Sequence, residues 1–362
     1  MQLAFLMYPV IIATGDLTAP VLTVKFAGRD LWISPFIASF LGFIIVFIVN
    51  QLHKWYPGKT MIQYMEDILG TVFGKLLGAL LIMYCLYSGT TVLRQYFELI
   101  AGGFLPETPV IVISASMVLV CSFAVRGGGE VLARLSQVIV PVIFLSWIII
   151  IILLLPDMKL IRMLPVMEKG IQPALMGAVP LLTWFDHFWL LSFFLPMLNE
   201  RQKGLKWSLI AVVVVTLVLT AINLMVLLIF GSLTSSLTYP AFAAVRYISI
   251  ASFLTRLESV VMALWVAGAF LKLSIFYYGL TMGAAQWLKL RDHHSLIFPM
   301  GILLALYSIW IAPSLQEFSH FMSTSNIFFN YSIELAIPLL VFAAAVIRRV
   351  AARDGQSTLR RT

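Results

Sequence analysis

The chain has 362 residues, of which 61% are hydrophobic and 11% are charged, and it carries a net charge of +8 at neutral pH. A soluble globular domain has about 25% charged residues and roughly 45 to 50% apolar residues, so the composition excludes a soluble globular protein. We therefore predict an integral membrane protein.

Apolar segments recur along the chain at the length of a membrane-spanning helix, about 20 residues for a hydrocarbon core of about 30 Å. They predict ten spans in two halves of five, 1–157 and 170–350, followed by a cytoplasmic tail at 351–362. Because five is odd, the second half would lie inverted relative to the first. We expect a single all-α membrane domain, 1–362, with a 5+5 inverted repeat. The predicted spans are 2–26, 31–53, 75–101, 109–125, 132–155, 171–197, 206–230, 257–288, 296–312 and 327–348.

The positions of the Lys and Arg residues predict the orientation of these spans. With a cytoplasmic N-terminus, the inside loops hold fifteen Lys and Arg residues and the outside loops hold seven. The positive-inside bias therefore places both termini in the cytoplasm. The net charge of +8 is then explained by topology and by contact with anionic membrane lipid, not by binding to nucleic acid.

The first predicted span contains residues that a lipid-facing helix does not carry. Gly15 and Asp16 lie between Pro9 and Pro20, near the middle of the segment. Gly, Pro and a carboxylate at bilayer depth free backbone groups that lipid cannot satisfy, so we expect a broken helix that faces protein or a water-filled cavity.

The sixth predicted span has the same character, with Gly177, Pro180, Asp186 and His187 inside it. Broken helices at corresponding positions of two halves are typical of transporters that bind substrate at the membrane midplane. The pair of interruptions therefore predicts a ligand site between the first and sixth spans.

The role of the first interruption has several interpretations. Asp16 could hold a cation or a proton, could bind a substrate amine directly, or could cap the second half of the helix. Gly15 would let the half-helix present free N–H groups to a carboxylate. Asp186 and His187 would supply the matching acceptors, although a single His in a span is more often a packing residue.

A charged residue inside a span is costly and needs compensation. Lys272 shares a helix face with Gly268 and Gly279, so we expect it to point into the bundle. Its expected partner is Asp16 or Asp186, either as a structural ion pair or with a role in binding a ligand, an ion or a proton.

The third predicted span carries two further candidates for the site. Arg94 and Glu98 are four residues apart, which favours a structural pair near the outer interface over direct contact with a ligand. Tyr87 and Thr91 lie deeper on the same segment and could line the site.

The sequence gives no sign of catalysis, of a bound metal or of a cofactor. Cys85 and Cys121 lie inside predicted spans, where a free Cys behaves as a small apolar residue. His293 and His294 lack the additional ligands that a zinc site needs. No nucleophile and base motif is present, so we do not expect an enzyme.

Short motifs are distributed along the whole chain. They are Ala27 to Ser34 (AGRDLWIS), Pro57 to Thr60 (PGKT), Leu105 to Pro109 (LPETP), Tyr239-Pro240, Arg246 to Ile248 (RYI), and Arg256 to Glu258 (RLE) followed by Trp265 and Lys272. In this order they resemble the B subunit of bacterial spore germinant receptors, a family of the amino acid, polyamine and organocation transporter superfamily.

The resemblance implies a ten-helix inverted-repeat fold in the inner membrane of a spore. It also implies assembly with a larger A subunit and a C-subunit lipoprotein, and recognition of a small nutrient germinant, often an amino acid. In that superfamily the ligand lies between the unwound parts of the first and sixth helices, flanked by the third and eighth. Carried over to this chain, the pocket residues are Thr14, Gly15, Asp16, Tyr87, Thr91, Thr183, Trp184, Phe185, Asp186 and Lys272.

The first interruption departs from the superfamily pattern. Members often carry a Gly-x-Gly backbone cradle there, whereas this chain has Gly15-Asp16-Leu17. Two function classes therefore stay open, a germinant receptor subunit and a proton- or sodium-coupled amino acid transporter, because both share the fold.

Overall fold

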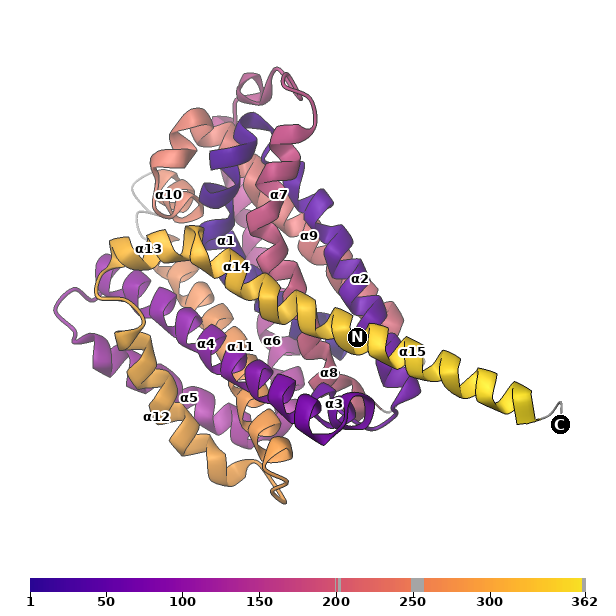
Figure 1. Ribbon diagram of the computed structural model, residues 1–362. Coiled ribbons are helices and arrows are strands. Elements are labelled where there is room, and N and C mark those ends of the chain that lie inside the picture. Colours follow the sequence, from indigo (N-terminus) through magenta and orange to yellow (C-terminus); the bar gives the residue numbers. More distant parts are fainter. Residues whose placement is uncertain (199, 201–202, 249–256, 360–362) are drawn as a thin grey trace.

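The computed structural model describes residues 1–198, 200, 203–248 and 257–359, and these residues form helices and connecting loops without a strand (Figure 1). Arg256, which belongs to one of the sequence motifs, lies outside the described residues. The helices of the first half are α1 (Gln2–Ala27), α2 (Ser34–Trp55), α3 (Met61–Leu69), α4 (Thr71–Gly103), α5 (Val110–Arg126) and α6 (Gly128–Leu154).

The second half begins with an interrupted helix and ends with one. Its elements are α7 (Gln172–Phe185), η4 (Asp186–Leu190), α8 (Leu191–Phe194), η5 (Leu195–Met197), α9 (Gly204–Phe230), η7 (Gly231–Ser236), α10 (Pro240–Tyr247), α11 (Leu257–Trp287), α12 (His294–Trp310), α13 (Leu315–Ser323), α14 (Ser325–Asn330), η8 (Tyr331–Leu335) and α15 (Ala336–Leu359).

The all-α membrane architecture predicted from the sequence is confirmed, because helices occupy every one of the ten predicted spans. Seven helices of the described chain are long and apolar enough to cross a membrane, and α12 with α13, bent by 99°, would make an eighth. The helix α5 is apolar but shorter. Ten crossings and a 5+5 inverted repeat therefore stay predictions. Residues 351–359 of the predicted tail continue α15 as a helix.

The predicted break in the first span is wrong, because α1 is one continuous helix that includes Pro9 and Pro20. Its neighbours enclose it on most sides, and buried surroundings allow Gly and Pro to remain within a membrane helix. Gly15 serves close packing, since a Cβ there would lie 3.2 Å from Leu219 and 3.7 Å from Trp184.

At the predicted break in the sixth span the helix changes type but does not unwind. The α-helix α7 ends at Phe185 and continues as the 3₁₀ segment η4 from Asp186 to Leu190. The sequence did not predict a second irregular segment, the π-helical turn η8 within the last span. In Figure 1 the run from α13 to α15 crosses the front of the bundle, and its middle part contacts α4 and η4.

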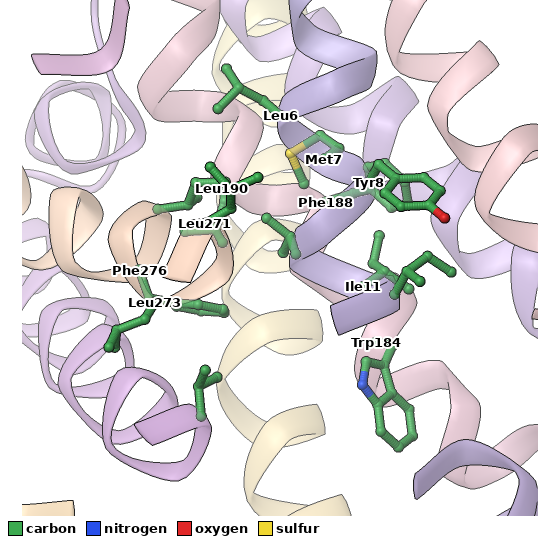
Figure 2. Close-up of a cluster of buried hydrophobic side chains, with 14 of the residues drawn as sticks. Leu6, Met7, Tyr8, Ile11, Trp184, Phe188, Leu190, Leu271, Leu273 and Phe276 are labelled. Carbon is green, nitrogen blue, oxygen red and sulfur yellow. The ribbon is translucent and has the colours of Figure 1, made fainter. Parts of the chain in front are cut away.

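A continuous apolar core holds the interrupted segment in place. Figure 2 shows Met7 and Ile11 of α1, Phe188 of η4, and Leu271 and Phe276 of α11 gathered in this core. Lipid tails are as apolar as these side chains, so the hydrophobic effect does not drive the helices together within the membrane. Van der Waals packing between the side chains stabilises these contacts. The positions of α1, η4 and α11 relative to one another are therefore set by side-chain fit.

A close backbone contact joins α3 and α4 at Gly74. A Cβ on Gly74 would lie 2.6 Å from the backbone of Glu66, whereas a Cβ on Gly102 of the same helix meets nothing within 4 Å.

We expect Gly74→Ala to destabilise the protein by about 1 to 3 kcal/mol, because backbone cannot move aside as a flexible side chain can. Gly102→Ala is the matched control, with no loss of stability. Thermal unfolding of the purified variants in detergent measures both, and equal unfolding temperatures would contradict the close packing.

Candidate functional site

A small polar cavity lies between α1, α4, α7, α11 and α14. About 30 Å³ of it is open to the centres of water molecules, enough for water and far below the roughly 300 to 1,000 Å³ of a typical ligand pocket. The cavity is therefore closed in this conformation. Its polar lining residues are Thr14, Tyr84, Tyr87, Ser88, Thr91, Gln95, Thr183, Trp184, His187, Lys272, Asn326 and Asn330.

Thr14 is the hydrogen-bonding centre of the cavity wall. Lys272 Nζ donates to Thr14 Oγ1 at 2.7 Å, and Trp184 Nε1 donates to the same oxygen at 3.0 Å. All three side chains are at least nine-tenths buried. One hydroxyl thus joins α1, α7 and α11, and the Lys272 ammonium, which has three N–H donors, retains donors for another acceptor.

Two tyrosines of α4 close the cavity against α14. The Tyr84 hydroxyl donates to Asn330 Oδ1 at 2.8 Å, and the Tyr87 hydroxyl donates to Asn326 Oδ1. The ring of Phe329 packs on Tyr87, with centroids 4.7 Å apart. We call these two hydrogen bonds the α4–α14 latch.

The structure brings six of the ten predicted site residues to the cavity wall. These are Thr14, Tyr87, Thr91, Thr183, Trp184 and Lys272. Their role as ligand-binding residues stays a prediction, because position alone does not show binding. Five further polar residues line the cavity and were not predicted: Tyr84, Ser88, Gln95, Asn326 and Asn330. The spacing of four residues between Asn326 and Asn330, which places both on one helix face, was the one signal for them in the sequence.

Four predicted site residues lie away from the cavity. Gly15 packs against Leu219. Phe185 is fully buried, and its ring packs against Gly42 of α2, where an added Cβ would lie 2.8 Å from it. Asp16 accepts a hydrogen bond at 2.8 Å from Trp265 Nε1. Asp186 belongs to a separate cluster. Because α1 does not unwind, consecutive residues face different directions, and of the three predicted residues on α1 Thr14 alone reaches the cavity.

The expected ion pair between Lys272 and a carboxylate is also absent from the described part of the chain. Lys272 is 98% buried and instead bonds to Thr14, with its ammonium 6.0 Å from the ring centroid of Phe276. Asp16 does face α11, but it bonds to Trp265, seven residues before Lys272, and Asp186 lies beside His187.

The irregular segments η4 and η8 bring a buried polar cluster together. His187 Nδ1 lies 2.7 Å from Glu334 Oε2 and 3.3 Å from Asp186 Oδ1. Trp189 Nε1 donates to Glu334 Oε1 at 2.6 Å. Glu334 was not predicted, although a carboxylate inside an apolar span is itself a signal of a functional or paired residue.

Arg94 and Glu98 form the structural pair that the sequence predicted. Their charged groups lie 2.6 Å apart, and Arg94 also donates to the carbonyl oxygens of Ala312 at 3.0 Å and Ile309 at 3.3 Å. The guanidinium therefore satisfies free carbonyls at the end of α12, where a cation is favoured by the helix dipole.

Comparison with known proteins identifies the family. The sequence profile described as "Spore germination protein" matches residues 1–315, which is most of the chain. The chain belongs to the spore germination protein family. Its relatives in that family include Spore germination protein KB of Bacillus subtilis (strain 168), 28% identical over 331 residues that cover 89% of this chain and 88% of the relative. Spore germination protein XB of Bacillus anthracis is 24% identical, with 89% and 88% covered.

The fold of this spore germination protein is similar to that of a transporter. A Na⁺-coupled sialic acid symporter, solved in a substrate-bound outward-open state, superposes with a TM-score of 0.66 and 11% sequence identity. The superposition covers 88% of this chain and 76% of the symporter. The family and the transporter-like fold implied by the sequence motifs are both confirmed, while identity this low carries no information on the ligand.

Proposed function

We propose that this protein is the membrane subunit of a spore germinant receptor that binds a small nutrient germinant, an amino acid, in the cavity between α1, α4, α7, α11 and α14. The observation that carries the proposal is the buried Lys272 ammonium on the wall of a polar cavity. A buried cation in a membrane protein needs an anionic partner, and none is bonded to it in the described residues. The carboxylate of an amino acid would supply that partner.

The chemistry of the cavity wall suits a zwitterion. Lys272 Nζ and Trp184 Nε1 both point at Thr14 Oγ1, so a carboxylate arriving there would meet two N–H donors. On the α14 side, the side-chain amides of Asn326 and Asn330 offer carbonyl oxygens to an ammonium group. The two ends of a zwitterionic amino acid would therefore find complementary groups on opposite walls.

Binding of such a ligand requires the cavity to widen, since about 30 Å³ of free space cannot hold an amino acid. The α4–α14 latch is the contact that closes it, so we propose that ligand entry separates α14 from α4. A ligand shifts a conformational equilibrium only by binding one state better than the other. In this proposal the occupied state has moved α14, and partner A and C subunits sense the movement.

The proposal includes a location in the spore inner membrane, with both termini cytoplasmic and membrane lipid around the bundle. It assigns no enzymatic activity to the chain. The names of the relatives support a role in spore germination, and the composition supports a multi-pass membrane location.

The likeness to a Na⁺-coupled symporter favours a second candidate function, a proton- or sodium-coupled amino acid transporter. We expect the purified chain in proteoliposomes to bind an amino acid without accumulating it, because a receptor subunit passes its conformational change to partners. Uptake of radiolabelled amino acids under imposed sodium and proton gradients measures this. Saturable accumulation driven by either gradient would replace the receptor proposal with the transporter.

A spore lacking the A and C subunits provides the matching genetic test. We expect this chain alone to give no germination response, even when immunoblotting shows normal levels in the membrane. A full response in spores that lack every related receptor would contradict the proposal.

A further inference from the structure

The cluster of Asp186, His187 and Glu334 shares only His187 with the cavity wall. Asp186 and His187 begin the 3₁₀ segment η4, and Glu334 lies in the π-helical turn η8, 147 residues after His187. Departures from α-helical geometry turn all three side chains toward one point. Asp186 and Glu334 have no exposed surface, and His187 is 7% exposed.

The spacing of the cluster fits a bound metal ion. One ligand atom from each residue lies within 4.8 Å of the other two. Two ligand atoms bound to the same Zn²⁺ ion at about 2.1 Å each lie up to about 4.2 Å apart. Small side-chain rotations would therefore bring all three atoms into one coordination sphere.

The poorly satisfied carboxylate of Asp186 points to a cation. Both of its oxygens are fully buried, and their one ion-pair contact among the described residues is with His187 Nδ1, which is 3.3 Å from Oδ1 and closer to Glu334, at 2.7 Å. Lys272, the buried ammonium nearest in the fold, is bonded to Thr14. A proton would satisfy one carboxylate oxygen, whereas a metal ion would neutralise both Asp186 and Glu334 at once.

The ligand types favour a transition metal. Mg²⁺ and Ca²⁺ prefer six or more oxygen ligands, while one imidazole nitrogen with two carboxylates is typical of Zn²⁺ and similar ions. The surrounding contacts also resemble a metal site, because Trp189 Nε1 donates to Glu334 and Phe276 packs edge-on against His187 at 5.2 Å. Such contacts fix the orientation of the ligands.

We propose that Asp186, His187 and Glu334 bind one divalent transition-metal ion, with Zn²⁺ as the first candidate. Three protein ligands would leave a fourth position open, as in many zinc sites. Because His187 also lines the cavity, the ion would lie in the cavity wall.

The test uses the full chain, purified without a His tag, stripped with a chelator and titrated with Co²⁺ as a spectroscopic probe. We expect one Co²⁺ per chain, visible absorption bands of four-coordinate cobalt, and displacement by Zn²⁺. Asp186→Asn and Glu334→Gln should each weaken binding at least 100-fold. Glu130→Gln removes the same charge from a carboxylate that is 72% exposed, and it should bind like the wild type.

Asp186→Asn keeps the fold most faithfully, because it is isosteric and the native carboxylate has only the 3.3 Å contact with His187 to lose. Unfolding temperature gives a second readout, since an ion that binds only the folded state stabilises it. We expect Zn²⁺ to raise Tm in the wild type and not in Asp186→Asn. The absence of saturable Co²⁺ binding to the wild type, or equal binding to Asp186→Asn, would overturn the site. Both measurements, Co²⁺ binding and Tm, are made on the purified chain, so they test the metal site independently of the proposed germinant-binding function.

Discussion

Spores carrying Lys272→Met should lose their germination response to the amino acid that triggers the wild type, with at least a 100-fold higher concentration required. The methionine side chain has a similar length and suits a buried position, so it removes the ammonium that would bind the ligand carboxylate while filling most of its volume. A charge-assisted hydrogen bond in a dry site accounts for a loss of this size. Germination is measured as the fall in spore optical density over a range of germinant concentrations.

Lys206→Met on α9 is the matched control, because Lys206 is exposed and does not line the cavity. It should leave the response unchanged. Immunoblots of inner-membrane fractions must show equal amounts of both variants. A normal response from a well-expressed Lys272→Met chain would mean that the ligand carboxylate binds elsewhere.

The α4–α14 latch predicts an effect in the opposite direction. The double variant Tyr84→Phe and Tyr87→Phe removes both hydroxyl donors and keeps the rings that pack against Phe329. Each buried hydrogen bond contributes about 1 kcal/mol to the closed state, so losing two should favour the open state by roughly 10- to 30-fold. Spores should then respond to about 10-fold less germinant, and some should germinate without any.

Tyr96→Phe, on the same helix but outside the latch, is the control and should respond as the wild type does. Spontaneous germination is counted by phase-contrast microscopy of spores stored in buffer. A double variant that needs more germinant than the wild type would show that the latch belongs to the bound state and not to the closed one.

The sequence predicted the helices well because apolar length is a strong signal in a membrane protein. Every predicted span is helical, and the interruption at Asp186 is where η4 begins. The predicted interruption at Gly15 was wrong because the sequence does not show whether neighbouring helices enclose this residue. A glycine is compatible both with a broken helix and with an intact helix that packs closely on a neighbour, and here Gly15 packs against Leu219.

The site was predicted less completely than the fold. Thr14 and Lys272, both predicted to line the pocket, contact each other, but Asp16 faces Trp265 because two residues of a continuous helix turn the side chain by about 200°. Glu334 was missed because the π-helical turn that aims it at His187 has no sequence signal of its own. Asn326 and Asn330 face the cavity only because α14 packs on α4 and α7, and this long-range contact is invisible in one sequence.

Equilibrium binding of individual amino acids to the purified chain in lipid nanodiscs tests the central claim most directly. The account predicts that at least one of the twenty amino acids binds the wild type saturably, at one molecule per chain. Lys272→Met should abolish that binding and Lys206→Met should preserve it. Equal binding to the wild type and to a folded Lys272→Met chain would contradict the claim that the germinant occupies the cavity beside Thr14 and Lys272.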